Sequence, residues 1–198
     1  MEIKDLSWND EKTTRLNNPL LPRNIRGLIV EKSASGKITM LLNLLLNNKS
    51  NINCQFYETS EDVPDPRDLS RDKKNMMIFD DLQLDDLQLE KQNKCESYYI
   101  GGRHSNVDCF YLAQNYFKLP RQTIRENTNF ICLFPQDLKN INNIYNDHVG
   151  ADDMSKEEFT KLCKTAWERP HGFVVIDLTS KTNNGKYRCG LDTFYISA

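Results

Sequence analysis

The feature that most constrains the fold is a series of short, almost wholly apolar runs along the chain. These runs cover residues 27–30, 76–79, 107–113 and 130–134. A strand with one face in water alternates apolar and polar residues, and these runs do not alternate. Strands of this kind are typical of a mainly parallel sheet that helices cover on both faces. The sequence therefore predicts an α/β fold with three layers.

The last third of the chain extends this pattern. Ser155 and Glu158 form a capping box, which predicts that a helix begins there. The spacing of apolar residues in 137–148 predicts another helix. Residues 173–178 predict a further strand, and 187–195 predict a C-terminal antiparallel strand or hairpin.

Chain length and the first residues indicate the domain organisation. A chain of 198 residues is long enough for one domain with a sizeable core. Residues 1–24 show little periodicity and end in a proline-containing stretch, so we expect an extended N-terminal lead-in. The single folded domain is expected to cover 25–198.

Composition excludes several classes of protein. The chain has no apolar run approaching the roughly 18 residues of a membrane helix, so we expect no membrane partner. Its net charge of -2 argues against coating nucleic acid through bulk positive charge. The 6 cysteines form no CxxC pair, so free, mostly buried thiols in a reducing compartment are expected.

Residues 31–39, EKSASGKIT, lie between a predicted strand and a predicted helix, where a phosphate-binding loop belongs. In the pattern GxxxxGK followed by Ser or Thr, backbone N–H groups cradle phosphates and the lysine reaches the terminal ones. Gly36 and Lys37 match this pattern, while Glu31 and Ile38 depart from it. A polar turn before a helix is the alternative interpretation. The candidate nucleotide-binding residues are Ser33, Ala34, Ser35, Gly36, Lys37, Ile38 and Thr39.

Both departures predict weaker ATP binding and slower ATP hydrolysis. The Glu31 carboxylate is expected to lie near the bound polyphosphate and to repel it. Ile38 removes the hydroxyl that normally binds magnesium, and Thr39 is about 100° further round the helix, which is a poor position to replace it.

Asp80 and Asp81 directly follow an apolar strand, which favours a catalytic function for the pair. Phosphoryl transfer needs one acid that holds magnesium, here Asp80, and a second that places the attacking water, here Asp81. The alternative is that the acids cap a helix. Gln114 ends the next predicted strand and is expected at the same sheet edge, where its amide could orient that water. An ordinary helix-start residue is the alternative for Gln114.

Basic residues provide weaker candidates. Arg103 lies in a glycine-flexible segment and suits an arginine that reaches a neighbouring subunit's nucleotide, with a surface salt bridge as the alternative. Lys118, Arg121 and Arg125 form a local patch that could contact a DNA backbone, and the spacing of the two arginines predicts one shared helix face. A solvated helix face is the alternative for this patch.

Five segments carry a resemblance to known proteins: PLLPRNIRGLIV, SGKITMLLNLLL, NMMIFDDL, GRHSNVDCFYLAQNYFKLPRQTIREN and SKEEFTKLCKTAWERPHGFVVIDL. Together they resemble the DNA-packaging ATPases of the FtsK-HerA superfamily. They are more closely similar to those of poxvirus-like large DNA viruses and of Polinton (Maverick) elements. The resemblance implies a RecA-like P-loop core, a homo-oligomeric ring, and ATP-driven translocation of double-stranded DNA into a capsid.

The resemblance also assigns positions. It places the Walker A lysine at Lys37, the Walker B acids at Asp80 and Asp81, the polar sensor at Gln114 and a trans-acting arginine at Arg103. ATP and magnesium are the implied cofactors, and capsid proteins are possible partners. The implied location is the host cytoplasm or nucleus, with virion association.

The sequence departs from the family at Glu31 and Ala34, where glycine is usual, and at Ile38, where threonine is usual. Gly101 stands where a further arginine is common. These departures lie at positions that are expected to act in ATP binding and hydrolysis. They leave the pattern of apolar core residues intact. A catalytically inactive remnant that serves as an assembly or structural subunit is therefore the alternative function. A small-molecule P-loop kinase is a third candidate, disfavoured because no lid-like arginine cluster is visible.

Overall fold

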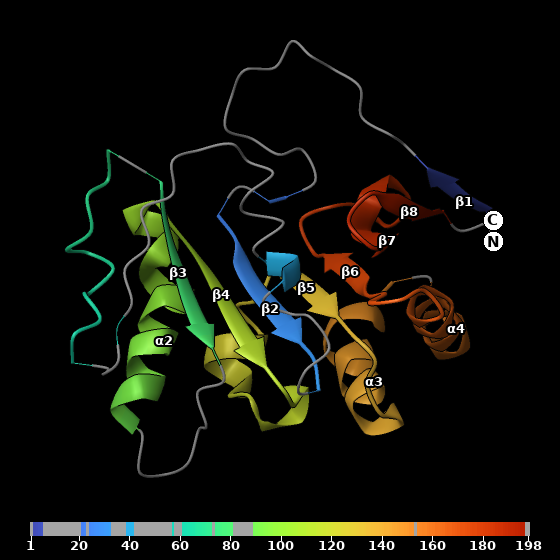
Figure 1. The fold of residues 1–198 in the computed structure, drawn as a ribbon, viewed down its shortest axis with the longest axis horizontal. Coiled ribbons are helices and arrows are strands. Elements are labelled where there is room, and N and C mark those ends of the chain that lie inside the picture. Colours follow the sequence, from blue (N-terminus) through green and yellow to red (C-terminus); the bar gives the residue numbers. More distant parts are fainter. Residues whose placement is uncertain are drawn as a thin grey trace.

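The computed structural model describes residues 2–5, 21–22, 24–32, 39–41, 57, 61–72, 74–80, 89–152 and 154–196. Its centre is one sheet with the strand order β1-β8-β7-β6-β5-β2-β4-β3 (Figure 1). The strands are β1 (Glu2–Asp5), β2 (Arg26–Val30), β3 (Asn75–Asp80), β4 (Val107–Ala113), β5 (Phe130–Leu133), β6 (Val174–Asp177), β7 (Tyr187–Cys189) and β8 (Thr193–Ile196). The described helices with printed bounds are α2 (Leu89–Gly101), α3 (Leu138–Ile144) and α4 (Lys156–Trp167).

The sheet has a parallel half and an antiparallel half. Strand β2 pairs in parallel with β4 and β5, and β3 pairs in parallel with β4. The pairs β5–β6, β6–β7 and β7–β8 are antiparallel. The predicted parallel core and C-terminal hairpin are therefore confirmed. The expected α/β class holds because β2, β4 and β5 are buried on both faces. Strand β3 is at the edge of the sheet, where Ile78 is 40% exposed.

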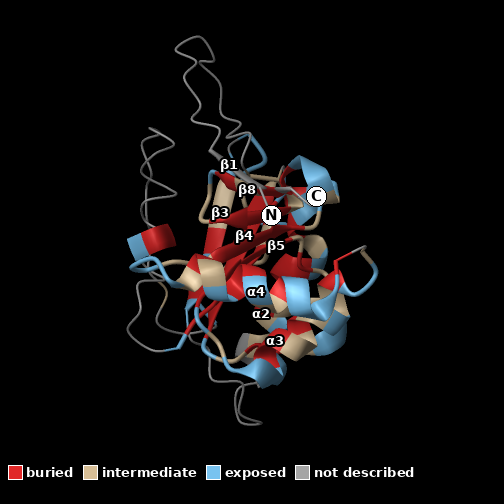
Figure 2. Cartoon of the chain, turned by 90° about the vertical axis from the view of Figure 1, so that its right-hand side faces the viewer, coloured by how far each residue is buried: buried red, intermediate tan, exposed pale blue. Residues whose placement is uncertain are grey.

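Two groups of buried side chains fill the two faces of the sheet. The larger group lies on the face covered by α2, α3 and α4, and includes Tyr98, Ile141 and Phe159. The smaller group lies on the opposite face, where Met40 and Leu41 pack from the helical segment at residues 39–41. Figure 2 shows the buried strands between helices whose outer sides are exposed. None of the described helices is long and apolar enough to cross a membrane.

Helix boundaries follow the predicted capping signals. The Ser155 hydroxyl accepts from the backbone N–H of Glu158 at 3.2 Å, and the Glu158 carboxylate accepts from the backbone N–H of Ser155 at 2.8 Å. This reciprocal capping box starts α4. Asp137 caps α3, and a π-helical turn over Tyr145–Val149 follows that helix.

The N-terminal segment differs from the expected lead-in. Strand β1 pairs antiparallel with β8 and forms one edge of the sheet. Its sequence, EIKD, has no apolar run, because an edge strand need not be buried on both faces. The expected boundary at residue 25 therefore does not account for these four residues, which join the sheet of the main domain.

The buried thiols agree with expectation in the described part of the chain. Cys95, Cys109, Cys132, Cys163 and Cys189 are free and buried. Burial raises the pKa of the Cys132 thiol to about 12. The thiolate is the reactive form of cysteine, so these residues act as packing groups.

Candidate functional site

The carboxyl ends of the parallel strands meet at one edge of the sheet. Val30, the last residue of β2, is level with Ala113 of β4 on one side and with Leu133 of β5 on the other. Asp80, the last residue of β3, is level with Leu112. In Figure 1 the arrowheads of β2, β3 and β4 point to this edge. In open parallel sheets, ligands bind at the carboxyl ends of the strands.

Strand alternation adds a second constraint. Ile29 belongs to the buried group on the face of the 39–41 helix, so the residue two further on, Glu31, is on the same side of the sheet. Leu112 belongs to that group as well, which places Gln114 on this side. Phe79 belongs to the opposite group, so its neighbour Asp80 is also on the 39–41 side. Asp80 and Gln114 therefore lie at the same edge and on the same face of the sheet, at the ends of the neighbouring strands β3 and β4.

The loop after β2 is described only at its two ends. Ser33, Ala34, Ser35, Gly36, Lys37 and Ile38 lie outside the described residues, and so does Asp81. Thr39 is exposed at the start of the helical segment, while Met40 and Leu41 are buried beneath it. Strand β2 and, on the expected face, the helical residues 39–41 therefore follow each other in the expected order.

Glu31 lies directly after β2, at the first position of the loop pattern. Its side chain is completely buried, and its backbone N–H donates to the Ala113 carbonyl at 2.9 Å. Glu31 thus continues the pairing of β2 with β4. This backbone N–H is already used within the sheet, and it cannot also donate to a phosphate without breaking that pairing.

The donor chemistry at this edge fits one magnesium ion bound together with phosphates. Asp80 supplies an exposed carboxylate, and Mg²⁺ in such sites usually takes one or two carboxylates, waters and substrate phosphate oxygens. Among the described residues no group of three or more His, Cys, Asp or Glu side chains could hold a metal by itself. Asp80 fits magnesium that arrives with a nucleotide.

Arg103 lies at the other edge of the sheet. It is exposed in a 3₁₀ turn, Gly102–Ser105, which comes directly before β4 begins at Val107. Its Nε lies 3.1 Å from His104 Nε2. Arg103 is therefore not brought together with Asp80 and Gln114 of the same chain, and a function for it at a nucleotide would have to be exerted on another subunit.

The basic patch that the sequence predicts is divided by the fold. The side chain of Arg121 is 67% exposed, and Lys118 is also exposed. The side chain of Arg125 is only 12% exposed and its Nη1 lies 2.8 Å from Asp147 Oδ2. The prediction that both arginines share one exposed face is wrong, because the Arg125 guanidinium turns inward to this carboxylate and over the Tyr116 ring.

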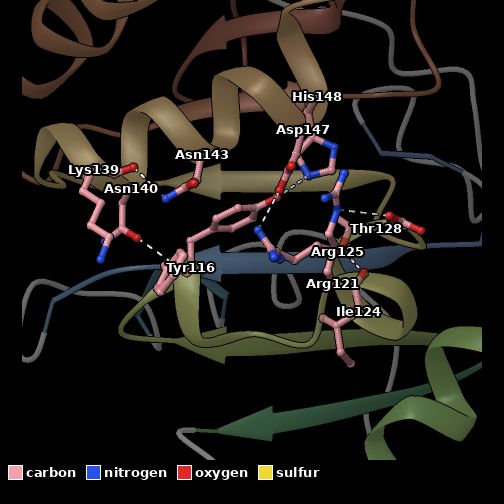
Figure 3. A network of polar contacts seen from close by, with 12 residues as sticks. Tyr116, Arg121, Ile124, Arg125, Thr128, Lys139, Asn140, Asn143, Asp147 and His148 are labelled. Atoms are coloured by element: carbon pink, nitrogen blue, oxygen red, sulfur yellow. Dashed lines mark hydrogen bonds and ion pairs between the residues drawn. The ribbon is translucent and has the colours of Figure 1, made fainter.

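Arg125 belongs to a buried polar network that sequence reasoning missed (Figure 3). The Tyr116 hydroxyl donates to Asp147 Oδ2 at 2.8 Å and lies 2.8 Å from His148 Nε2. Because this hydroxyl has a single proton and gives it to Asp147, Nε2 of His148 must donate to the hydroxyl oxygen. Burial lowers the pKa of His148 to about 4 and so favours the neutral imidazole. The network ties the segment after β4 to the π-helical turn after α3.

The fold and the arrangement of strand ends define a class of protein. The sheet, with its mainly parallel central strands, its antiparallel C-terminal strands and an acid at the end of β3, matches the fold of P-loop NTPases. No family model matches the chain, and no curated protein sequence matches it significantly.

Solved structures similar to this chain are those of the genome packaging NTPase B204 from Sulfolobus turreted icosahedral virus 2. The AMP complex matches with a TM-score of 0.53 and 11% identity, over 86% of this chain and 98% of B204. The sulfate complex gives a TM-score of 0.53 and 11% identity, over 89% and 98% of the two chains. The AMPPCP complex gives 0.51 and 13%, over 90% and 100%. At this identity the likeness establishes the fold.

Proposed function

We propose that this chain is a subunit of an ATP-driven motor that packages double-stranded viral or transposon DNA into a capsid. The observation that carries the proposal is that Asp80, at the end of β3, and Gln114, after β4, lie at the carboxyl edge that these strands share with β2. Strand alternation puts both on the face of the 39–41 helix. The overall similarity to a viral genome packaging NTPase supports it. The sequence resemblance to FtsK-HerA packaging ATPases of the poxvirus-like and Polinton type supports the finer assignment.

Each candidate residue has a distinct task in this proposal. Residues 33–36 cradle the phosphates with backbone N–H groups, and Lys37 binds the terminal ones. Asp80 holds magnesium, which supplies charge neutralisation on the phosphate oxygens when it is bound. Asp81 and Gln114 place the attacking water. The edge position and exposure of Asp80 and Gln114 are compatible with these tasks.

The remaining partners follow from assembly. Arg103 acts on the nucleotide of a neighbouring subunit in a homo-oligomeric ring. This agrees with its position before β4, at the sheet edge opposite the carboxyl ends of the parallel strands of its own chain. Lys118 and Arg121 contact the DNA backbone, and capsid proteins bind the assembled ring. The motor operates in the host cytoplasm or nucleus and associates with the virion.

The alternative function is a catalytically inactive assembly or structural subunit. The buried Glu31 favours this alternative, because its carboxylate side chain occupies a position that belongs to a glycine in the family that the sequence resembles. Ile38 adds the loss of a magnesium ligand. Both functions keep the fold, and they differ in whether bound ATP is hydrolysed.

ATP binding and hydrolysis, measured with and without duplex DNA, distinguish the two. The motor requires turnover that duplex DNA stimulates, and Asp80→Asn should abolish this turnover while the exposed-loop control Asp68→Asn keeps it. Nucleotide binding without turnover, or no binding at all, would refute the motor and support the assembly subunit. Transfer of phosphate to a nucleoside monophosphate would instead support a small-molecule kinase.

A further inference from the structure

We propose that Phe117, Lys118, Arg121 and Lys139 form a binding surface for unpaired, single-stranded nucleic acid. The residues come from the turn after β4, the π-helical turn Arg121–Arg125 and the start of α3. The inference goes beyond the proposed function, because it concerns an unpaired strand and requires no nucleotide hydrolysis.

The centre of this surface is an exposed aromatic ring on a fixed backbone. Phe117 is 49% exposed. Its backbone N–H donates to Asn115 Oδ1 at 3.1 Å and to Asn140 Oδ1 at 3.2 Å. Asn140 is itself held, since its backbone N–H donates to Asp137 Oδ1 at 2.9 Å. The ring is therefore presented to solvent from a backbone with little freedom, which lowers the entropy cost of binding.

One cation contacts the ring, and two more lie along the same segment of the chain. Lys139 Nζ lies 4.2 Å from the centroid of the Phe117 ring, a cation–π contact. Lys118 follows the ring directly and is exposed. Arg121 is exposed in the next turn, where Glu126 lies 3.2 Å from its Nε. Figure 3 shows Lys139 and Arg121 at opposite ends of the same polar cluster. The positive charges can pair with successive backbone phosphates of a nucleic acid, while the apolar ring can stack on one of its bases.

The buried network beneath the surface supports it from inside. Tyr116 is fully buried, and its hydroxyl is fixed by Asp147 and His148. Arg125 is fixed by the same carboxylate. Both ends of the segment 116–125 are thus attached to the π-helical turn after α3, so Phe117 and Arg121 keep their relative positions.

The exposed ring selects an unpaired strand as the occupant. An aromatic side chain binds nucleic acid by stacking on the face of a base, and bases in an intact duplex already stack on each other. Leu138, directly before Lys139, is 63% exposed and adds apolar surface at the start of α3. A duplex would use the three cations and leave the ring without a partner.

Fluorescence anisotropy with a labelled oligothymidylate and with a mixed-sequence duplex of the same length tests the proposal, without nucleotide present. Phe117→Ala should weaken single-strand binding at least about fivefold, and Phe117→Tyr should retain it. Ile100→Ala, which truncates a side chain that is 53% exposed on α2, is the matched control and should change nothing. The expected effect of Phe117→Ala on duplex binding is small.

A second readout covers the cations. Changing Lys118, Arg121 and Lys139 together to Gln should reduce the salt dependence of single-strand binding by about 2 in the log–log slope. The same change at Lys156, Lys161 and Lys164, which are exposed on α4, should leave the slope unaltered. This readout decides the question if Phe117→Ala does not fold.

Three outcomes would overturn the proposal. The first is equal single-strand affinity of the wild type and Phe117→Ala. The second is the absence of single-strand binding in the wild type. The third is a change of oligomeric state in Phe117→Ala with unchanged DNA affinity, which would assign the surface to a second copy of the chain. None of these outcomes depends on ATP hydrolysis, so they are separable from a failure of the proposed motor function.

Discussion

Acidification should destabilise this protein through His148. The imidazole is largely buried between Tyr116, Asp147 and Arg125, and burial lowers its pKa from 6.5 to about 4. The negative charge of Asp147 opposes this shift, and the positive charges of Arg125 and Lys186 add to it. In the unfolded chain the histidine accepts a proton near pH 6.5, whereas the native state does not until about pH 4.

The sign and the magnitude follow from this difference. Between the two pKa values the unfolded state binds more protons, so the free energy of unfolding falls as the pH falls. The contribution of the neutral imidazole is fully present above the unfolded pKa and is lost progressively below it. Since one pH unit in this window corresponds to about 1.4 kcal/mol, lowering the pH from 7 to 5 should cost about 2 kcal/mol.

Urea denaturation at a series of pH values measures this cost. In His148→Gln the loss between pH 7 and pH 5 should be smaller by about 2 kcal/mol than in the wild type. His104→Gln, which changes an exposed histidine outside the network, should keep the wild-type dependence. If His148→Gln and the wild type lose the same stability over this range, the imidazole is not held neutral and the reasoning is refuted.

Three further predictions concern stability, measured by chemical denaturation. Asp177→Ala should destabilise the fold by about 3–5 kcal/mol, because it leaves Arg188, whose Nη2 lies 2.7 Å from Asp177 Oδ2, as a buried charge without this carboxylate; an effect below about 1 kcal/mol would contradict this. Gly27→Ala should lower the free energy of unfolding by about 1–3 kcal/mol, because the new methyl group would overlap the buried Phe110 ring. Unchanged stability would show that the Phe110 ring can move aside and would contradict this prediction. Gly101→Ala should stabilise by about 0.5–1 kcal/mol, because this helical position of α2 has open space around a Cβ, and a loss of stability would be the contrary result.

The parallel core could be predicted because its signal is local. Strands β2, β4 and β5 are buried on both faces, so each appears as an almost wholly apolar run, interrupted in β4 by Asp108. The ends of these runs also locate Asp80 and Gln114, since parallel strands end at the same edge. The capping box of α4 is likewise a short-range pattern. Each of these features needs only a few consecutive residues.

The features that the sequence did not predict depend on distant parts of the chain. Strand β1 has a polar sequence and becomes a strand only because β8 is beside it. The pairing of Arg125 with Asp147 joins residues 22 positions apart, and their spacing alone gives no sign of it. The burial of Glu31 follows from its pairing with β4, which pattern matching to a phosphate-binding loop does not include. Residues 33–38 and Asp81 remain predictions.

The most direct test of the central claim is a comparison of ATP turnover between the wild type and the double variant Glu31→Gly with Ile38→Thr, with and without duplex DNA. Glu31→Gly removes the buried carboxylate from the first position of the loop pattern. Ile38→Thr returns a magnesium ligand whose loss should cost several kcal/mol of transition-state stabilisation. The account predicts slow turnover by the wild type and at least roughly a hundredfold faster, DNA-stimulated turnover by the double variant. Equal turnover by the two proteins would contradict it, and so would a double variant that binds no ATP.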